Sequence, residues 1–345
     1  NYRMAFKKLA MITQEADGWQ VPDWRRLQAD LVTGVGELCE RLSLRPDQIP
    51  GGADDDSAFP LRVPRRYLDL IEPGNPDDPL LLQILATGRE REAVPGYNAD
   101  PLDESRHTPV PGLLHKYHGR ALLVVTGACA VHCRYCFRRH FPYQEHLSGG
   151  RWQQALDWLA RRTDINEVIL SGGDPLTLSN RRLGELLEAL AALPHLRRLR
   201  IHSRTPVVIP ERLDEGLAAL LASPRWRATL VLHANHPREI SPALAERCRA
   251  LGRGGVTLLN QSVLLAGVND DAEALASLSD ALFEAGVLPY YLHQLDAVAG
   301  AAHFAVPDAR ARDLHAALRD RLPGFLVPRL AREEPGAGSK TVLAG

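Results

Sequence analysis

The feature that most constrains the fold is a regular alternation of apolar runs and amphipathic segments that begins at residue 121. The apolar runs are short and rich in β-branched residues, and the segments between them carry apolar residues at helical spacing. Such an alternation is typical of parallel strands covered by helices. The expected strands cover residues 121–127, 167–173, 198–204, 228–235, 256–265 and 288–296.

The segments between these runs are expected to be helices, over residues 152–162, 181–193, 211–222, 242–252 and 272–286. Six consecutive strand–helix units without a GxGxxG turn after the first strand favour a barrel or partial barrel over a dinucleotide-binding sheet. A seventh apolar run, residues 325–331, is expected to close or extend the sheet.

The pattern divides the 345 residues into three parts: a helical N-terminal region over 1–110, a core over 111–322, and a C-terminal strand and loop over 323–345. In the first part, residues 23–44 and 80–88 are expected to form helices. This region carries no catalytic motif and is expected to act as a helical cap.

Charge and hydropathy narrow the function classes. The chain carries 41 Lys and Arg against 42 Asp and Glu, so its formal charge of −1 gives no general attraction to nucleic acid or an anionic membrane. No run approaches the roughly 18 apolar residues of a membrane span, and the first residues lack the apolar stretch of a signal peptide. We therefore expect a cytoplasmic protein that binds neither nucleic acid nor membrane.

Polar residues gather at the expected carboxyl ends of the strands, where barrels of this kind place their active sites. Three of the five cysteines follow the first strand in a CxxxCxxC motif, at Cys129, Cys133 and Cys136. An SGGDPL stretch follows the second strand, over residues 171–176. This gathering is the first indication of function in the sequence.

Three thiolates at this spacing can hold three corners of a [4Fe–4S] cluster and leave one iron open to a ligand. A zinc ion would need a fourth ligand, for which His132 or His140 is available. A buried trio without metal is disfavoured because the loop is rich in Arg and His. Cys39 and Cys248 lie in amphipathic segments and are expected to be ordinary buried thiols.

With its aromatic residue before the last cysteine, the motif resembles that of the radical S-adenosylmethionine enzymes, and SGGDPL resembles their glycine-rich stretch. The resemblance implies an α/β fold, a radical SAM partial (β/α)6 barrel, in which the open iron chelates S-adenosylmethionine. Cleavage of that cofactor yields a 5′-deoxyadenosyl radical. Read alone, SGGDPL is also a common turn, and His233 a core histidine. The implied S-adenosylmethionine contacts are Ser171, Gly172, Gly173, Asp174, Ser203, His233 and Gln261.

The resemblance narrows to the lysine 2,3-aminomutase family. It rests on GACAVHCRYCFRRHFPY, RIHSRTPVVIP, NQSVLL, PYYLHQLD and GAAHF, within matching motifs that run from about residue 61 to 341. The family implies a second cofactor, pyridoxal 5′-phosphate, and an isomerisation that moves the amine of L-lysine from C2 to C3.

Pyridoxal requires a lysine to hold it, and the chain has only four: Lys7, Lys8, Lys116 and Lys340. The family motif places its pyridoxal lysine at Lys340, in a small-residue loop after the last strand. Without the resemblance, Lys340 reads as a solvated tail residue. The family places its phosphate contacts at Lys116, Tyr117 and Arg120, which otherwise read as a basic surface turn.

The substrate also needs anchors for a carboxylate and a distal ammonium. Arg138 matches the family's carboxylate-binding arginine, a role suited to a guanidinium fork. Asp296 and Glu333 match its two ammonium-binding acids, although the family has Asp where this chain has Glu333. Arg138 otherwise reads as solvent-facing and Asp296 as a helix N-cap. For His202, which replaces a smaller residue, the sequence offers no account.

The short C-terminal end and the loop sequence are most similar to the bacterial branch that serves elongation factor P. That branch implies (R)-β-lysine as product, a separate ligase that attaches it to the factor, and an electron donor such as flavodoxin or ferredoxin. A homo-oligomer is possible. The alternatives are an aminomutase for free lysine or for another amino acid such as glutamate, or a non-catalytic zinc module. The two acids disfavour glutamate, and the neutral charge disfavours the zinc module.

Overall fold

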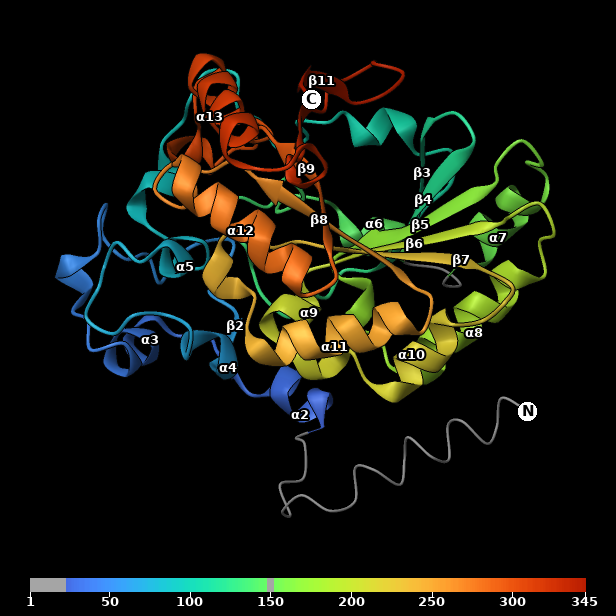
Figure 1. The fold of residues 1–345 in the computed structure, drawn as a ribbon, viewed down its shortest axis with the longest axis horizontal. Coiled ribbons are helices and arrows are strands. Elements are labelled where there is room, and N and C mark those ends of the chain that lie inside the picture. The colour runs from blue at the N-terminus through green and yellow to red at the C-terminus, as the bar shows by residue number, and fades with distance from the viewer. Residues whose placement is uncertain (1–22, 148–151) are drawn as a thin grey trace.

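The computed structural model describes residues 23–147 and 152–345. Its main feature is a nine-stranded sheet in the order β11-β10-β9-β8-β7-β6-β5-β4-β3 (Figure 1). The strands are β3 (Leu113–Tyr117), β4 (Arg120–Thr126), β5 (Glu167–Gly172), β6 (Arg198–Ser203), β7 (Arg227–Leu232), β8 (Thr257–Val263), β9 (Leu288–His293), β10 (Arg329–Arg332) and β11 (Thr341–Ala344).

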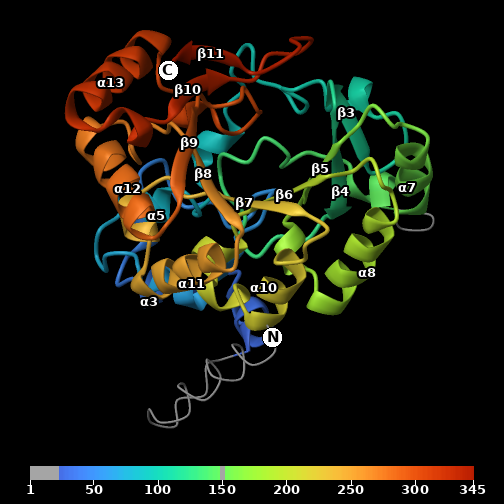
Figure 2. The same ribbon diagram turned by 45° about the vertical axis from the view of Figure 1, so that its right-hand side comes forward.

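The six strands β4 to β9 are parallel and coincide with the six expected runs to within a few residues. β10 adds in parallel to β9, so the seventh run extends the sheet. The outermost strands are antiparallel to their neighbours: β3 pairs with β4 and β11 with β10. The sheet curves, but its edge strands β3 and β11 do not pair with each other. The result is an open, partial barrel (Figure 2). The α/β fold class and the partial barrel are confirmed.

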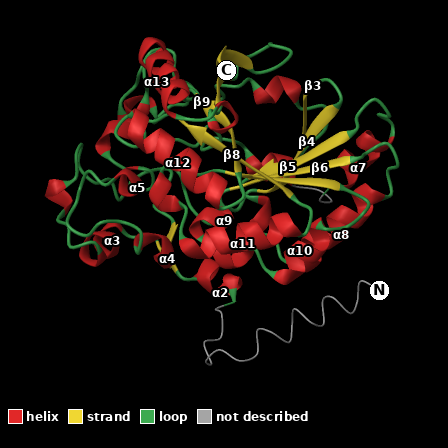
Figure 3. Cartoon of the chain, in the orientation of Figure 1, coloured by secondary structure: helices red, strands yellow, loops and turns green. Residues whose placement is uncertain are grey.

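Helices cover the convex face of the sheet (Figure 3). They are α7 (Gln153–Ala160), α8 (Asn180–Ala191), α10 (Glu215–Leu221), α11 (Pro242–Arg253), α12 (Ala272–Glu284) and α13 (Asp308–Arg321). Two short helices, α6 (Tyr143–Leu147) and α9 (Thr205–Val208), come after the ends of β4 and β6. Four begin at a side chain that accepts a hydrogen bond from a free amide of the first turn, namely Ser179, Asp214, Ser241 and Asp271. The apolar faces of α7, α8, α10 and α11 form one buried core with the strands.

The N-terminal region differs from the expected helical cap. In place of one helix over 23–44 it has α2 (Trp24–Ala29), β1 (Leu31–Val32) and α3 (Val35–Arg41). The chain breaks because β1 pairs with β2 (Val63–Pro64) and Gly34 then begins a new helix. The rest holds the short helices α4 (Arg65–Leu68) and α5 (Pro79–Leu82), so the helix expected over 80–88 ends early. No helix in the described part of the chain is both long and apolar enough to cross a membrane.

Candidate active site

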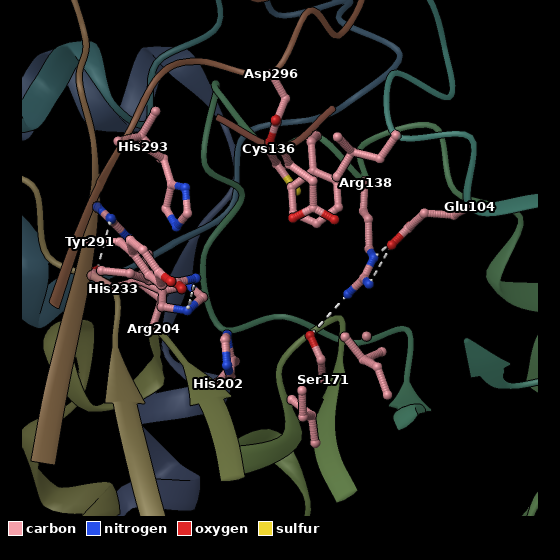
Figure 4. Close-up of a pocket in the computed structure, with 18 of the residues that line it drawn as sticks. Glu104, Cys136, Arg138, Ser171, His202, Arg204, His233, Tyr291, His293 and Asp296 are labelled. Carbon is pink, nitrogen blue, oxygen red and sulfur yellow. Dashed lines mark hydrogen bonds and ion pairs between the residues drawn. The ribbon is translucent and has the colours of Figure 1, made fainter. Parts of the chain in front are cut away.

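A cavity of about 550 Å³ lies inside the curve of the sheet and is lined by the cysteine loop and the inner faces of the strands. All seventeen residues that the sequence assigned to a site line it. Figure 4 shows Arg138 and Glu104 on one side, His233, Tyr291 and His293 on the other, and Asp296 at one end. The individual roles of these residues remain predictions.

The cysteine loop between β4 and α6 is held from behind by the N-terminal region. The Arg62 Nε atom donates to the carbonyl of Cys129 at 2.8 Å. The amides of His132 and Arg134 donate to the carbonyls of Arg62 and Gln83, each at 2.9 Å. The N-terminal region therefore fixes the backbone that carries the three thiols.

Burial raises the pKa of all three loop thiols. A neighbouring thiol or carboxylate raises the pKa of each of them further. The pKa of Cys136 rises to about 11. Thiols in such a place become ligands only where a metal supplies compensating positive charge. Within residues 23–147 and 152–345, no group of three His, Cys, Asp or Glu side chains is placed to hold one metal ion. In a [4Fe–4S] cluster each thiolate binds a different iron, so the sulfurs need not converge on one point.

The zinc alternative requires His132 or His140 as its fourth ligand. His132 Nδ1 lies 2.8 Å from the carbonyl of Pro60, and its ring stacks on Phe59. His140 Nε2 lies 3.1 Å from the carbonyl of Ala299. Each ring keeps one nitrogen free, but no group of three His, Cys, Asp or Glu side chains among the described residues is placed for a single metal ion. The three cysteines therefore fit the separate irons of a cluster better than one zinc ion. Cys39 and Cys248 are buried apart from it, as expected of bystanders.

The glycine pair at the end of β5 is required by the packing of the protein itself. Gly172 has a φ of +121°, which favours glycine, and a Cβ there would lie 2.6 Å from the carbonyl oxygen of Thr126. A Cβ on Gly173 would lie 2.4 Å from the carbonyl oxygen of Ala128. The two glycines let β5 pass directly against the start of the cysteine loop. Close approach to a ligand is therefore not the only reason for them.

Asp174 is buried and ties the end of β5 to the end of β6. Its carboxylate accepts hydrogen bonds from the Ser203 hydroxyl at 2.6 Å and from the amides of Arg204 and Thr205 at 2.8 Å each. It also accepts from the amide of Leu176 at 3.0 Å. Asp174 and Ser203 thus shape the cavity wall, and the Ser203 oxygen can meet a ligand only as an acceptor.

Lys340 is not a solvated tail residue. It lies just before β11, its side chain is 26% exposed, and its Nζ atom lies 3.0 Å from a carboxylate oxygen of Glu333. The second Glu333 oxygen lies 3.0 Å from Nζ of Lys116. Burial raises the pKa of Glu333, but Lys340 and Lys116 outweigh it and bring that pKa to about 2. The other two lysines, Lys7 and Lys8, lie outside the described residues.

The three residues expected to contact the phosphate of pyridoxal 5′-phosphate come from a hairpin that the sequence did not indicate. Lys116 and Tyr117 lie on β3, and Arg120 begins β4. The Arg120 guanidinium lies over the Tyr117 ring, 4.6 Å from its centre. Because Arg120 is at the start of its strand, this group lines the cavity at the end opposite the cysteine loop.

Arg138 is buried, not solvent-facing, at 5% exposure. Its Nε and one terminal nitrogen donate to the two oxygens of Glu104 at 2.9 and 2.7 Å, and the other terminal nitrogen donates to the Ser171 hydroxyl at 2.9 Å. A guanidinium has five N–H groups, so two remain for an anionic ligand. Sequence reasoning missed Glu104, which lies in a turn-rich stretch without a motif.

Asp296 follows β9 and is not a helix N-cap. Burial, and then the charge of Glu333, raise the pKa of Asp296 to about 7. No cation among the described residues lies within ion-pair distance of its carboxylate. A carboxyl group in this state would be stabilised in its ionised form by a cationic ligand.

Three histidines form the opposite wall. His233 Nε2 lies 2.9 Å from the Gln261 side-chain amide, and burial lowers the pKa of His233 to about 3. His202 lies edge-on to His233, with ring centres 5.6 Å apart. The Nε2 atoms of His202 and His293 are buried and find no hydrogen-bond partner among the described residues. Unsatisfied buried nitrogens in a cavity wall fit a site that takes a polar ligand.

The fold and this site define a class of protein. The sequence-family model of the radical SAM superfamily matches residues 123–278 of this chain. This part carries the cysteine loop and strands β5 to β8. The chain is also 51% identical to L-lysine 2,3-aminomutase of Escherichia coli K12, over 93% of this chain and 94% of that protein. It is 45% identical to L-lysine 2,3-aminomutase of Haemophilus influenzae, over 97% and 100%. The enzyme of that name from Clostridium subterminale is 36% identical, over 92% and 77%.

The chain therefore belongs to the lysine 2,3-aminomutase family of radical SAM enzymes. The family resemblance in the sequence is confirmed, and with it the cofactor set of a [4Fe–4S] cluster, S-adenosylmethionine and pyridoxal 5′-phosphate.

Proposed function

We propose that this chain isomerises L-lysine to (R)-β-lysine by moving the amine from C2 to C3. The observation that carries the proposal is the position of Asp296, a carboxyl group in the cavity wall that has no cation of its own. An ionised carboxylate in such a place is costly until a cation joins it. A substrate with a distal ammonium supplies that cation.

The other end of the substrate requires an anion site. Arg138 is anchored by Glu104 and Ser171 and keeps two N–H groups for a carboxylate. A fixed guanidinium orients a carboxylate more strictly than a flexible lysine would. Arg138 and Asp296 together select an amino acid with positive charge at the end of its side chain.

Lys340 is the residue that we propose holds pyridoxal 5′-phosphate. Of the two described lysines that line the cavity, Lys116 lies within β3, whereas Lys340 lies in the loop before β11. Lys116, Tyr117 and Arg120 gather positive charge and an aromatic ring on one cavity wall, which suits a phosphate. When bound, the cluster with S-adenosylmethionine supplies a radical that takes hydrogen from C3, and pyridoxal supplies the π-system through which the amine migrates.

This chain's own residues exclude water and keep charges in place during that reaction. Glu333 holds the amines of Lys340 and Lys116 together, and Gly172 and Gly173 let the end of β5 pack directly against the cysteine loop. Neutral His202, His233 and His293 line the wall without adding a charge, because burial lowers the pKa of each.

The substrate assignment is tested by comparing L-lysine, norleucine and L-glutamate in anaerobic turnovers of the reconstituted chain with S-adenosylmethionine, pyridoxal 5′-phosphate and dithionite. Norleucine keeps the lysine side chain but lacks its ammonium. We expect turnover of L-lysine, at least about tenfold lower kcat/KM for norleucine, and none for glutamate. Equal turnover of lysine and norleucine would show that Asp296 does not recognise the ammonium of the substrate.

The finer assignment, β-lysine for elongation factor P, rests on the similarity to the bacterial branch noted in the sequence. It makes a separate ligase the consumer of the product and a flavodoxin or ferredoxin the electron donor. We also propose a cytoplasmic location, because all five cysteines are free thiols and an oxidising compartment would favour disulfides.

A further inference from the structure

A short segment before strand β3, residues 98–104, joins the two ends of the proposed substrate site, and we call it the strap. Its first residue, Asn98, pairs in parallel with the loop directly after Asp296. The Asn98 amide donates to the carbonyl of Ala297 at 3.0 Å, and the Asn98 carbonyl accepts from the amide of Ala299 at 2.8 Å. The strap thus begins on the loop that carries the acid expected to bind the substrate ammonium.

The strap ends at the residue that orients Arg138. The Glu104 carboxylate accepts hydrogen bonds from Nε and one terminal nitrogen of Arg138, at 2.9 and 2.7 Å (Figure 4). Between its two ends the strap contributes Leu102 to the cavity wall, where this side chain is 4% exposed. One short segment therefore connects the place for the substrate ammonium with the place for its carboxylate.

The shape of the strap is set by Asp100, an exposed residue outside the cavity. Its carboxylate oxygens accept hydrogen bonds from the amides of Glu104 at 2.9 Å and Ser105 at 3.1 Å. The Asp100 amide donates to the side-chain oxygen of Asn98 at 2.9 Å, and the Asp100 carbonyl accepts from the amide of Asp103 at 3.2 Å. Aspartate side chains organise turns through such bonds to the backbone. These bonds fold the strap into a compact turn and fix Glu104 relative to Asn98.

The backbone next to Arg138 is held to the same loop as the strap. Two residues further along the chain, His140 Nε2 lies 3.1 Å from the carbonyl of Ala299. The strap fixes the guanidinium of Arg138, and the His140 contact fixes the backbone close to it. Because both contacts lead to the loop that follows Asp296, they set the separation between Arg138 and Asp296.

A fixed separation between two charged groups discriminates between substrates of different length. An amino acid with a distal ammonium satisfies both groups only where its carboxylate and ammonium are the same distance apart as its two partners. A missing methylene alone changes kcat/KM by about 10- to 200-fold in an apolar pocket, and a buried charge that is left without its partner adds to that cost.

We propose that the strap is the element that determines which side-chain length the site accepts, and that Asp100 is the positioning residue that holds the strap in shape. The accepted length is that of L-lysine, whereas L-ornithine, which is one methylene shorter, reaches one charged group at a time. Asp100 acts through Glu104 and touches no substrate. The proposal rests on the proposed function, in which Arg138 binds the carboxylate and Asp296 the ammonium.

The test is a competition between L-lysine and L-ornithine in anaerobic turnovers of the reconstituted full chain with S-adenosylmethionine, pyridoxal 5′-phosphate and dithionite. Both amino acids are supplied together, so the ratio of their products gives the ratio of their kcat/KM values directly. KM and kcat for lysine and the temperature of unfolding are measured separately for each protein.

Two substitutions of Asp100 are compared with one control. Asp100→Ala removes both acceptor oxygens, whereas Asp100→Asn keeps one of them and also decides the question where Asp100→Ala does not fold. Asp271→Ala is the matched control, because Asp271 is another exposed carboxylate that accepts from a backbone amide, that of Ala274 at 2.8 Å. It begins α12 and lies outside the cavity.

In the unsubstituted chain we expect kcat/KM for lysine to exceed that for ornithine at least about tenfold. Loss of the capping bonds should lower this ratio about fivefold in Asp100→Ala and about twofold in Asp100→Asn. The change should come from a higher KM for lysine, with kcat nearly constant. Asp271→Ala should keep the ratio of the unsubstituted chain even where it lowers the unfolding temperature equally.

An unchanged ratio in the folded Asp100 variants, or an equal fall in Asp271→Ala, would overturn the role of the strap and leave the lysine assignment intact. An unsubstituted chain that turns over lysine and ornithine equally would also overturn it. A cluster-loaded chain that acts on neither amino acid would overturn the proposed function, and the role of the strap with it.

Discussion

The ammonium nitrogen of Lys340 lies 3.0 Å from a carboxylate oxygen of Glu333, and the other oxygen of that carboxylate is bound to Lys116 at the same distance. Lys116 lies on β3 and Lys340 lies directly before β11, and β3 and β11 are the two edge strands of the nine-stranded sheet. One carboxylate therefore joins the two edges that the backbone leaves unpaired. This bridge spans the open side of the barrel.

This bridge predicts an acid-sensitive contribution to stability. Lys340 and Lys116 outweigh the effect of burial and lower the pKa of Glu333 to about 2, below the ordinary glutamate value of about 4.3. A lowered carboxyl pKa stabilises the fold above the unfolded value and loses that stabilisation as the pH falls from about 4.3 toward about 2. Thermal unfolding at several pH values should show this loss in the unsubstituted chain and not in Glu333→Gln. Parallel curves for the two proteins would contradict the bridge.

Asp296 predicts the opposite pH dependence. Burial, and then Glu333, raise its pKa to about 7, so folding is disfavoured progressively as the pH rises from about 3.9 to about 7. Only the ionised form attracts an ammonium, so KM for lysine should fall as the pH rises through about 7. Asp296→Asn should lose this dependence and bind lysine more weakly by about 2–5 kcal/mol. The readout is KM for lysine between pH 6 and 9; an unaltered profile in Asp296→Asn would assign the ammonium to another acid.

Glu104 is expected to act through Arg138. Glu104→Gln keeps the shape of the side chain but weakens the two charge-assisted hydrogen bonds that orient the guanidinium. KM for lysine should rise about 5- to 30-fold, which corresponds to about 1–2 kcal/mol, while kcat changes little. Asp103→Asn is the control, because Asp103 is the neighbouring acid and, among the described residues, forms its ion pair with the exposed Arg106 and not with Arg138. A fall in kcat with unchanged KM would speak against a role in carboxylate binding.

The contact between Gly173 and the cysteine loop predicts a loss of stability. In Gly173→Ala the new Cβ would lie 2.4 Å from the carbonyl oxygen of Ala128, so the loop must shift, at a cost of about 1–3 kcal/mol. Gly324→Ala is the control, since no atom lies within 4 Å of its Cβ position. Thermal unfolding and iron content should both fall in the first variant only. Equal stability of the two variants would show that the loop does not pack as described.

The periodicity of the sequence was enough to predict the six parallel strands and most of the helices between them. It failed for 23–44, where pairing of Leu31–Val32 with Val63–Pro64 overrides local helical preference. It also missed β3 and β11, because short edge strands leave too few residues for a periodic signal.

Sequence motifs singled out the cysteines and Lys340, and the structure brings them to one cavity; their roles remain predictions. The Glu333–Lys116 contact joins residues 217 positions apart, and Glu104 meets Arg138 across 34 positions. No local pattern records such pairings. His202 remained without a role in the sequence, and the structure adds only that its Nε2 atom is a buried, unpartnered group in the cavity wall.

The most direct test of the account is chiral analysis of the product. The reconstituted full chain and its Lys340→Ala variant are incubated anaerobically with L-lysine, S-adenosylmethionine, pyridoxal 5′-phosphate and dithionite. Covalent retention of pyridoxal is measured after borohydride reduction. We predict (R)-β-lysine from the unsubstituted chain, and neither product nor retained pyridoxal from Lys340→Ala. A cluster-loaded chain that makes no β-lysine, or a Lys340→Ala variant that retains pyridoxal undiminished, would contradict the account.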